Sequence, residues 1–502
     1  MESPTAISIK KMGVDEIISR KDDPEIGFVL ASANVYVDKI DGLSITERST
    51  KCLGLAQAVL TAIYSKKEEE VDPCLYKALI DISRSGLHAQ FTQMMGPPPE
   101  KYWGVNVYGY DFNGNPDDVK MFTPYNYFIA LGHYGYRRPY EALNSLNQTI
   151  SGHNRMMEMM KKGNCDPAPI FGKILIDYHI LRIKIWRDIS ENLEPNLKRD
   201  AYSVIIGAMQ DVANDLEALE EKKAAAAYRA ECAIFAKRRN LSPKSGGIRA
   251  DLAGTVDEDT ASYEDWCWKN RYWLTPMNEF SHVPRREWMK DTIGWGTTSS
   301  NQIRIKDIIR TYSHCRRILF EYTRIPRAER VHMTDDDMFD RLLDCYLRLY
   351  SILDKTMKLI ALDILHEKPV TELDYKNLPK YWDLEYNEVF KKKQNRCKYL
   401  RFITDLNRDL SVDEKDRDRG FIDSFYVIHR VKLTPGNIRN LMIHSAVEII
   451  DSDQKERERK TNIITISPMD LEVEVKKLMM QVRELLLGIN LAMYKGAGRL
   501  PD

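Results

Sequence analysis

Apolar residues recur every three or four positions along most of the chain, and this spacing predicts a mainly α-helical protein. The clearest patterns predict a helix from Ser44 onward and helices over Leu75–Ile82, Ile170–Trp186, Tyr202–Ala236 and Met338–Leu365. Ser44 and Glu47 have the spacing of a capping box, in which each side chain accepts a hydrogen bond from the backbone of the other residue. Ser467 followed by Pro468 predicts the start of a C-terminal helix in the same way.

One segment alternates instead of following the helical period. Trp103–Tyr110 places Val105 and Val107 on one face, as a β-strand does, and Asn113-Gly114 then gives the signal of a tight turn. A second strand over Val119–Phe122 completes the pattern. We therefore expect a small β-hairpin inside an N-terminal helical lobe.

The composition changes twice along the chain. Met1 to about Gly27 is polar without a strong period, which predicts an extended arm that is frayed or lent to a neighbouring subunit. Leu241–Ser262 contains one proline, three glycines and an acidic run, which predicts a boundary. The predicted organisation is an exchange arm over 1–27, an N-terminal lobe over 28–240, an inter-lobe loop over 241–265 and a C-terminal lobe over 266–502.

The 74 basic and 74 acidic residues cancel, so a nucleic-acid site must come from local sorting of charge. The eight cysteines form no C-x-x-C pair and no Cys/His cluster at zinc spacing, which predicts reduced thiols in a cytosolic or nuclear compartment and no metal site. No apolar run is long enough to span a bilayer, and Met1–Ile18 lacks the apolar core of a signal peptide. We expect neither a secreted nor a membrane-inserted protein.

Basic residues gather in three regions. Arg137 and Arg138 end a helical pattern that begins at Pro124, and paired guanidinium groups suit phosphate oxygens. Asn301–His332 has eight basic residues against three acids, and Lys391–Asp409 has seven against two. Arginines at a helix end also serve the helix dipole, and a charge run is commonly a solvated face, so both readings stay open.

A cluster of tryptophans lies at the start of the predicted C-terminal lobe. Trp266, Trp268 and Trp273 lie among Lys269 and Arg271, so they could stack nucleic-acid bases. Large aromatic residues at close spacing more often form a core, and we favour that interpretation.

Three segments in the N-terminal half resemble a known family. Cys74–Ile82, Tyr102–Gly114 and Leu131–Leu146 follow one another as an apolar helix, a short strand and turn, and a helix ending in arginines. This order resembles the nucleoproteins of rhabdoviruses and related negative-strand RNA viruses. In the C-terminal half, Tyr322–Arg330 resembles the arginine-rich segment that such nucleoproteins place against RNA.

The resemblance implies two helical lobes with an RNA cleft between them, and a protein that polymerises on single-stranded viral RNA without sequence preference. It implies no enzymatic activity and no cofactor. The implied partners are RNA, further copies of the chain in a ring or helical filament, and a viral phosphoprotein and polymerase; the implied location is the virion nucleocapsid and the host cytoplasm or nucleus. The expected RNA-binding residues are Arg137, Arg138, Arg316, Arg317, Arg324, Arg327, Arg330 and Arg408.

A second resemblance gives an alternative function. Arg439, Asn440 and His444 match the R-N-x-x-x-H signature of HEPN ribonucleases, in which the histidine acts as general acid or base and the arginine stabilises phosphate charge without a metal. A histidine with ordinary structural partners explains the same residues. The sequence contains no phosphate-binding loop, dinucleotide fingerprint or nucleophile elbow.

Overall fold

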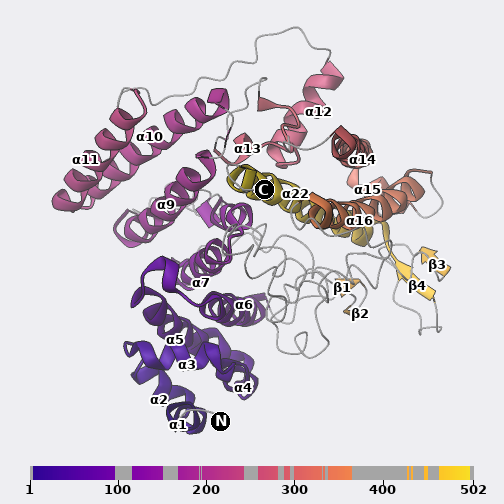
Figure 1. Cartoon of the computed structure of the whole chain (residues 1–502). Helices are drawn as coiled ribbons and strands as arrows, with labels where there is room; N and C mark the ends of the chain where they lie inside the picture. The colour runs from indigo at the N-terminus through magenta and orange to yellow at the C-terminus, as the bar shows by residue number, and fades with distance from the viewer. Residues whose placement is uncertain are drawn as a thin grey trace. The chain divides into compact units, whose positions relative to one another are not determined.

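The computed structural model describes residues 4–95, 116–147, 149–150, 168–191, 193, 195–241, 258–280, 288–293, 299–330, 332–333, 337–363, 427–428, 431–432, 446–449 and 463–497. This described part is mainly α-helical, as the hydrophobic spacing predicted (Figure 1). The helices belong to two compact units, and the change from one to the other falls between Arg238 and Glu258, the interval in which the composition predicted a boundary.

The N-terminal unit contains the helices up to Arg238. They are α1 (Pro4–Lys11), α2 (Val14–Ser19), α3 (Pro24–Ser32), α4 (Val35–Asp41), α5 (Ile45–Tyr64), the 3-10 helix η1 (Glu68–Glu70), α6 (Pro73–Met95), α7 (Pro116–Gly135), α9 (Ala168–Ser190), α10 (Pro195–Ala218) and α11 (Lys222–Arg238). A further helical segment covers 139–147.

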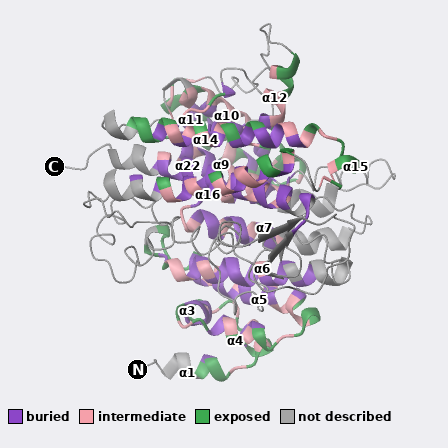
Figure 2. Cartoon of the chain, turned by 90° about the vertical axis from the view of Figure 1, so that its right-hand side faces the viewer, coloured by how far each residue is buried: buried purple, intermediate pink, exposed green. Residues whose placement is uncertain are grey.

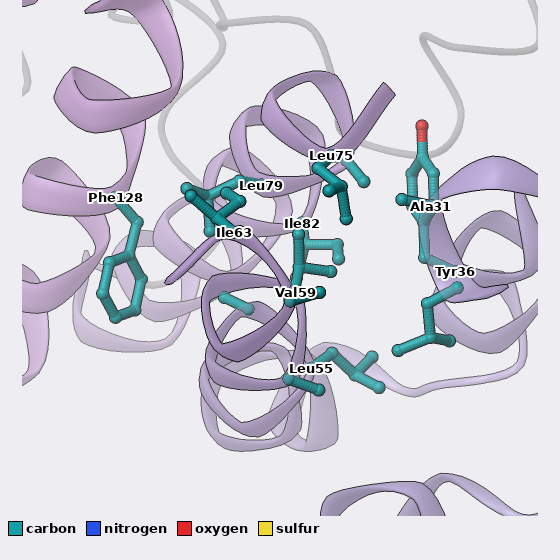
Figure 3. Close-up of a cluster of buried hydrophobic side chains, with 14 of the residues drawn as sticks. Ala31, Tyr36, Leu55, Val59, Ile63, Leu75, Leu79, Ile82 and Phe128 are labelled. Carbon is teal, nitrogen blue, oxygen red and sulfur yellow. The ribbon is translucent and has the colours of Figure 1, made fainter. Parts of the chain in front are cut away.

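The hydrophobic core of this unit forms around α5 and α6, with α3, α4 and α7 packed against them. Figure 3 shows part of it: Leu55, Val59 and Ile63 of α5 gather with Leu75, Leu79 and Ile82 of α6. Successive residues of each set are three or four positions apart, so each helix turns one apolar face inward. At Gly27 of α3 a side chain would collide with the Ala58 carbonyl of α5, so glycine permits the close crossing of these helices.

The predicted extended arm over 1–27 is wrong for its described residues. They form α1, α2 and the start of α3, and Ile9, Ile17 and Ile26 are buried in the core of the same unit. The Asp23 carboxylate caps α3 by accepting a hydrogen bond from the Glu25 N–H at 3.0 Å. Helices this short show only about two turns each, too few for a periodic pattern to stand out.

The second strand of the predicted β-hairpin is also wrong, because Val119–Phe122 lies inside α7. The first strand, Trp103–Tyr110, and the turn at Asn113-Gly114 lie outside the described residues. The helical period that follows, from Tyr125 to Tyr134, continues the same helix and outweighs a short local alternation.

Several sequence predictions are confirmed. α5 begins with both hydrogen bonds of the capping box between Ser44 and Glu47, and α6 and α9 cover the predicted segments Leu75–Ile82 and Ile170–Trp186. α16 (Asp337–Asp363) covers the described part of the predicted helix Met338–Leu365. The prediction of one helix over Tyr202–Ala236 is corrected to two, α10 and α11. They are separated at Glu220, whose φ of 63° interrupts the helical backbone.

The C-terminal unit contains the remaining elements. They are α12 (Glu258–Lys269), α13 (Met277–Phe280), α14 (Ser299–Arg324), α15 (Arg327–Arg330), α16, α22 (Pro468–Ala497) and two short strand pairs, antiparallel β1 (Val427–Ile428) with β2 (Val431–Lys432) and parallel β3 (Ala446–Ile449) with β4 (Ile463–Ile466). Helices α14, α16 and α22 pack on one another, and the Tyr322 hydroxyl of α14 donates to the Pro468 carbonyl at 3.3 Å. Among the described helices, none has a stretch apolar and long enough to cross a membrane.

Candidate nucleic-acid interface

Arg137 follows the C-terminal end of α7 in a left-handed conformation, with a φ of 65°. Its N–H donates to the Tyr134 carbonyl at 3.0 Å, and the Arg138 N–H donates to the His133 carbonyl at 2.8 Å. These two bonds form a Schellman motif, which usually has glycine at the position of Arg137. The helix end therefore places an arginine where the backbone favours a residue without a side chain.

The Arg137 side chain belongs to a three-residue charge cluster in the N-terminal unit. The Glu68 carboxylate of η1 accepts from Arg137 Nη1 at 3.2 Å and from Lys184 Nζ of α9 at 2.7 Å. The Arg137 side chain is only 11% exposed, whereas Glu68 and Lys184 are 41% and 53% exposed. Partial burial alone would raise the pKa of Glu68, but the hydrogen bond from Lys184 and the charges of Lys184 and Arg137 outweigh it and lower the pKa.

Arg138 does not reach the surface beside Arg137. It is 2% exposed, and its carbonyl accepts from the Ala142 N–H at 3.0 Å, so the residue forms the start of the helical segment over 139–147. The two arginines were expected to lie together at the surface, but Arg138 is buried; their contact with RNA stays a prediction. Arg137 alone of the pair keeps part of its side chain at the surface.

Arg316 of α14 is likewise a buried structural residue, 3% exposed. Its guanidinium donates to both oxygens of Asp291 at 2.8 and 3.0 Å, to the Tyr272 carbonyl at 3.0 Å and to the Tyr263 hydroxyl at 2.8 Å. Its face lies 4.2 Å from the centre of the Trp273 ring. Burial acts to lower the pKa of Arg316, but the charge of Asp291 and the hydrogen bonds to it raise the pKa above its usual value. Its donors are engaged inside the unit, so Arg316 has a structural role here, and its contact with RNA stays a prediction.

A second buried arginine completes this network from α22. Arg483 donates to Glu279 of α13 at 2.8 Å and to the Trp273 carbonyl at 2.9 Å. Trp268 and Trp273 are themselves buried, which confirms that the tryptophan cluster belongs mainly to the core. The two arginines satisfy backbone carbonyls where the chain turns between α12 and α13, because buried carbonyls need hydrogen-bond donors.

The exposed face of α14 carries a row of basic side chains. Lys306, Arg310, Arg317 and Arg324 are exposed and lie four, seven and seven positions apart, so they project from one side of the helix. The Arg310 side chain is 82% exposed. At a rise of about 1.5 Å per residue, positions four and seven apart are separated by about 6 and 10.5 Å along the helix, so the row presents cations at intervals along one side of α14.

Helix α16 adds a second basic row beside the first. Arg341, Arg348 and Lys355 are exposed and lie seven positions apart. Arg341 bonds to Glu321 at 2.8 Å and Lys355 to Asp307 at 2.8 Å, so α16 runs antiparallel to α14 and the two rows are linked through these carboxylates. We call these two rows the α14–α16 basic face. It consists of Lys306, Arg310, Arg317, Arg324, Arg341, Arg348 and Lys355.

Carboxylates neutralise the α14–α16 basic face only in part. Asp307 is shared by Arg310 and Lys355, and Glu321 is shared by Arg317 and Arg341. Asp259 pairs with Arg324, and Asp344 pairs with Arg348. Among the described residues Lys306 makes no ion pair, and the seven cations have four carboxylate partners. The face therefore keeps a positive excess although the whole chain has no net charge.

Two further predicted residues lie at or near α15. Arg327 is exposed on this short helix, which Figure 2 shows at the surface. Arg330 is mostly buried, because its guanidinium pairs with Glu472 of α22 and lies 5.4 Å from the Tyr322 ring centre. Arg408, the basic segment Lys391–Asp409, and Arg439 with His444 lie outside the described residues.

The structure thus separates the predicted arginines by exposure. Arg138, Arg316 and Arg330 are mostly buried, whereas Arg317, Arg324 and Arg327 are exposed on the C-terminal unit. Five exposed basic residues that were not predicted as RNA-binding lie on two helices, α14 and α16: Lys306, Arg310, Arg341, Arg348 and Lys355. Their signal was present in the sequence as basic residues seven positions apart on two amphipathic helices.

The chemistry of the face is that of anion binding. Exposed guanidinium and ammonium groups bind phosphate oxygens by charge-assisted hydrogen bonds. In the described ranges, His, Cys, Asp and Glu side chains form no group of three or more that could hold a metal ion.

Comparison of the chain with protein-family models, with curated protein sequences and with solved structures finds no match.

Proposed function

We propose that this protein is a nucleoprotein that binds single-stranded RNA through its phosphate backbone and coats it without sequence preference. The observation that carries the proposal is the α14–α16 basic face, two rows of exposed cations on two helices that pack against each other. Helices that pack on a common core hold the rows in a fixed arrangement, so the protein loses little conformational entropy when a polyanion binds.

The ion pairs on this face suit an exchangeable site. Exposed ion pairs contribute only about 0–1 kcal/mol each, so RNA phosphates can replace the carboxylates at small cost. Binding then releases counterions from the RNA and depends strongly on salt. Contacts to phosphate carry no sequence information, which is what a protein that coats a whole genome requires.

The family resemblance adds the remaining parts of the proposal. Arg324 and Arg327 belong to the arginine-rich segment that resembles the RNA-binding segment of viral nucleoproteins, and both are exposed. On that resemblance we propose assembly of many copies along one RNA strand, with a viral phosphoprotein and polymerase as partners. Assembly would multiply a modest affinity per subunit.

The test is RNA binding by a variant of the face and a matched control. The variant Arg310→Gln/Arg317→Gln/Arg324→Gln removes three cations from the face, and Lys222→Gln/Lys223→Gln/Lys237→Gln removes three exposed cations from α11. Fluorescence anisotropy with labelled oligouridine and oligoadenine measures the affinity. We expect the two oligonucleotides to bind wild type alike, the α14 variant to bind at least about tenfold more weakly, and the α11 variant to bind like wild type.

Two results would contradict the proposal. One is wild-type protein that purifies free of nucleic acid and does not bind either oligonucleotide. The other is an equal loss of affinity in the α11 control, which would show a general effect of net charge and no special role for α14. Circular dichroism of each variant checks that the fold is kept.

A further inference from the structure

A charge cluster of Glu68, Arg137 and Lys184 lies in the N-terminal unit. Arg137 comes from the end of α7, Lys184 from α9 and Glu68 from η1, so three elements converge on one point. The two cations share one carboxylate, whose two oxygens are each used by a different cation. This is the arrangement in which a protein holds an oxyanion.

The Arg137 guanidinium is held in place by its surroundings, because its side chain is only 11% exposed. Its Nε is buried and has no hydrogen-bond partner, and its ion pair to Glu68 is made through Nη1. The Lys184 ammonium lies 5.3 Å from the centre of the Tyr134 ring, which holds it beside Arg137. Guanidinium groups bind carboxylate and phosphate with the same geometry, so a phosphate could take the place of the Glu68 carboxylate.

The segment that supplies Glu68 is an acidic turn. Glu68, Glu69 and Glu70 form η1 in the short connection between α5 and α6, and Glu68 and Glu70 are exposed. An acidic turn at the surface can release its carboxylate without breaking the core of the unit.

We propose that Arg137 and Lys184 form a phosphate site that Glu68 occupies as an intramolecular competitor, and that RNA displaces Glu68 when it binds to the N-terminal unit. The choice of RNA as the ligand rests on the proposed function, whereas the phosphate site does not. Glu68 then lowers the affinity for RNA and keeps the site closed to small anions.

The test compares two variants that remove the same charge two residues apart. Glu68→Gln takes away the competing carboxylate, and Glu70→Gln is the matched control. Because an exposed pair contributes no more than about five-fold to an equilibrium, we expect Glu68→Gln to bind labelled oligouridine about three- to five-fold more tightly than wild type. Glu70→Gln should gain less than half of that, and Glu68→Gln/Lys184→Met should lose the gain.

A second arm uses tripolyphosphate and isothermal titration calorimetry to separate this proposal from the proposed function. Tripolyphosphate that binds to Glu68→Gln and not to Glu68→Gln/Lys184→Met supports the phosphate site even where no protein binds RNA, and that outcome would overturn the nucleoprotein function alone. Equal RNA affinities of Glu68→Gln and Glu70→Gln would overturn the competitor role of Glu68. No binding of tripolyphosphate to Glu68→Gln would overturn the site.

Discussion

Two regions of the C-terminal unit use arginine in opposite ways. In the buried network, Arg316 and Arg483 are enclosed by carboxylates and backbone carbonyls and join the segment between α12 and α14 to α14 and α22. On the α14–α16 basic face, Arg317 and Arg324 are exposed, and each pairs with a carboxylate at the surface, Glu321 and Asp259 respectively. Arg316 and Arg317 are neighbours in the sequence, yet successive helix residues differ by about 100° in direction. The turn of the helix therefore decides which arginine stabilises the fold and which can meet a ligand.

The largest expected effect is on stability. Arg316→Met leaves the Asp291 carboxylate without its main partner in a mostly buried position, and breaking a buried pair costs about 3–5 kcal/mol. Arg317→Met removes one exposed pair and should cost less than about 1 kcal/mol. Urea unfolding followed by circular dichroism measures both. Equal losses for the two neighbours would break the comparison.

The second expected effect is on RNA affinity and concerns the row on α16. Arg341→Gln/Arg348→Gln/Lys355→Gln removes the basic row that was not expected from the sequence. We predict oligouridine binding about tenfold weaker than wild type, equivalent to about 1.4 kcal/mol. Unchanged affinity in the anisotropy assay would limit the interface to α14.

A third prediction concerns Arg137, whose side chain is less buried than that of Arg316 and less exposed than that of Arg317. Arg137→Gly relieves a left-handed residue by about 1 kcal/mol and removes a partly exposed ion pair of similar size. Thermal unfolding should therefore change little, while RNA affinity should fall. Arg137→Ala removes the same charge without relieving the backbone, so it should be less stable than Arg137→Gly.

The smallest expected effect is a pH dependence. The pKa of Glu68 is lowered in the folded protein, so its ion pairs stabilise the fold above the pKa of the unfolded chain and lose that effect as the pH falls through the folded value. The free energies of unfolding of wild type and Glu68→Gln should therefore differ at neutral pH, and the difference should shrink as the pH falls below the ordinary glutamate pKa of about 4.3. A constant difference down to acid pH would show that Glu68 acts through another contact.

The sequence predicted local features well because they depend on nearby residues. The capping box at Ser44 and the start of α22 after Ser467 are both local hydrogen-bonding patterns, and both are confirmed. The burial of Arg316 could not be predicted, because its main partners, Asp291, Tyr272 and Tyr263, lie 25, 44 and 53 positions away in the sequence. A charge count over a window also mixes the buried and exposed faces of a helix.

The positions of the basic residues on each helix of the α14–α16 basic face could have been predicted from the sequence. Arg341, Arg348 and Lys355 fall on one face of a helix whose opposite face is apolar, and a heptad count of charges would have found them. What the sequence could not give is the antiparallel pairing of α14 with α16, which depends on contacts between Glu321 and Arg341 and between Asp307 and Lys355.

The salt dependence of RNA binding tests the central claim most directly. The logarithm of the oligouridine affinity is measured against the logarithm of the salt concentration for wild type and for Arg310→Gln/Arg317→Gln/Arg324→Gln. If α14 contacts the phosphate backbone, three lost contacts of about 0.7 each should reduce the slope by about 2. Two parallel lines would contradict the account, because they would show that these arginines do not meet RNA phosphates.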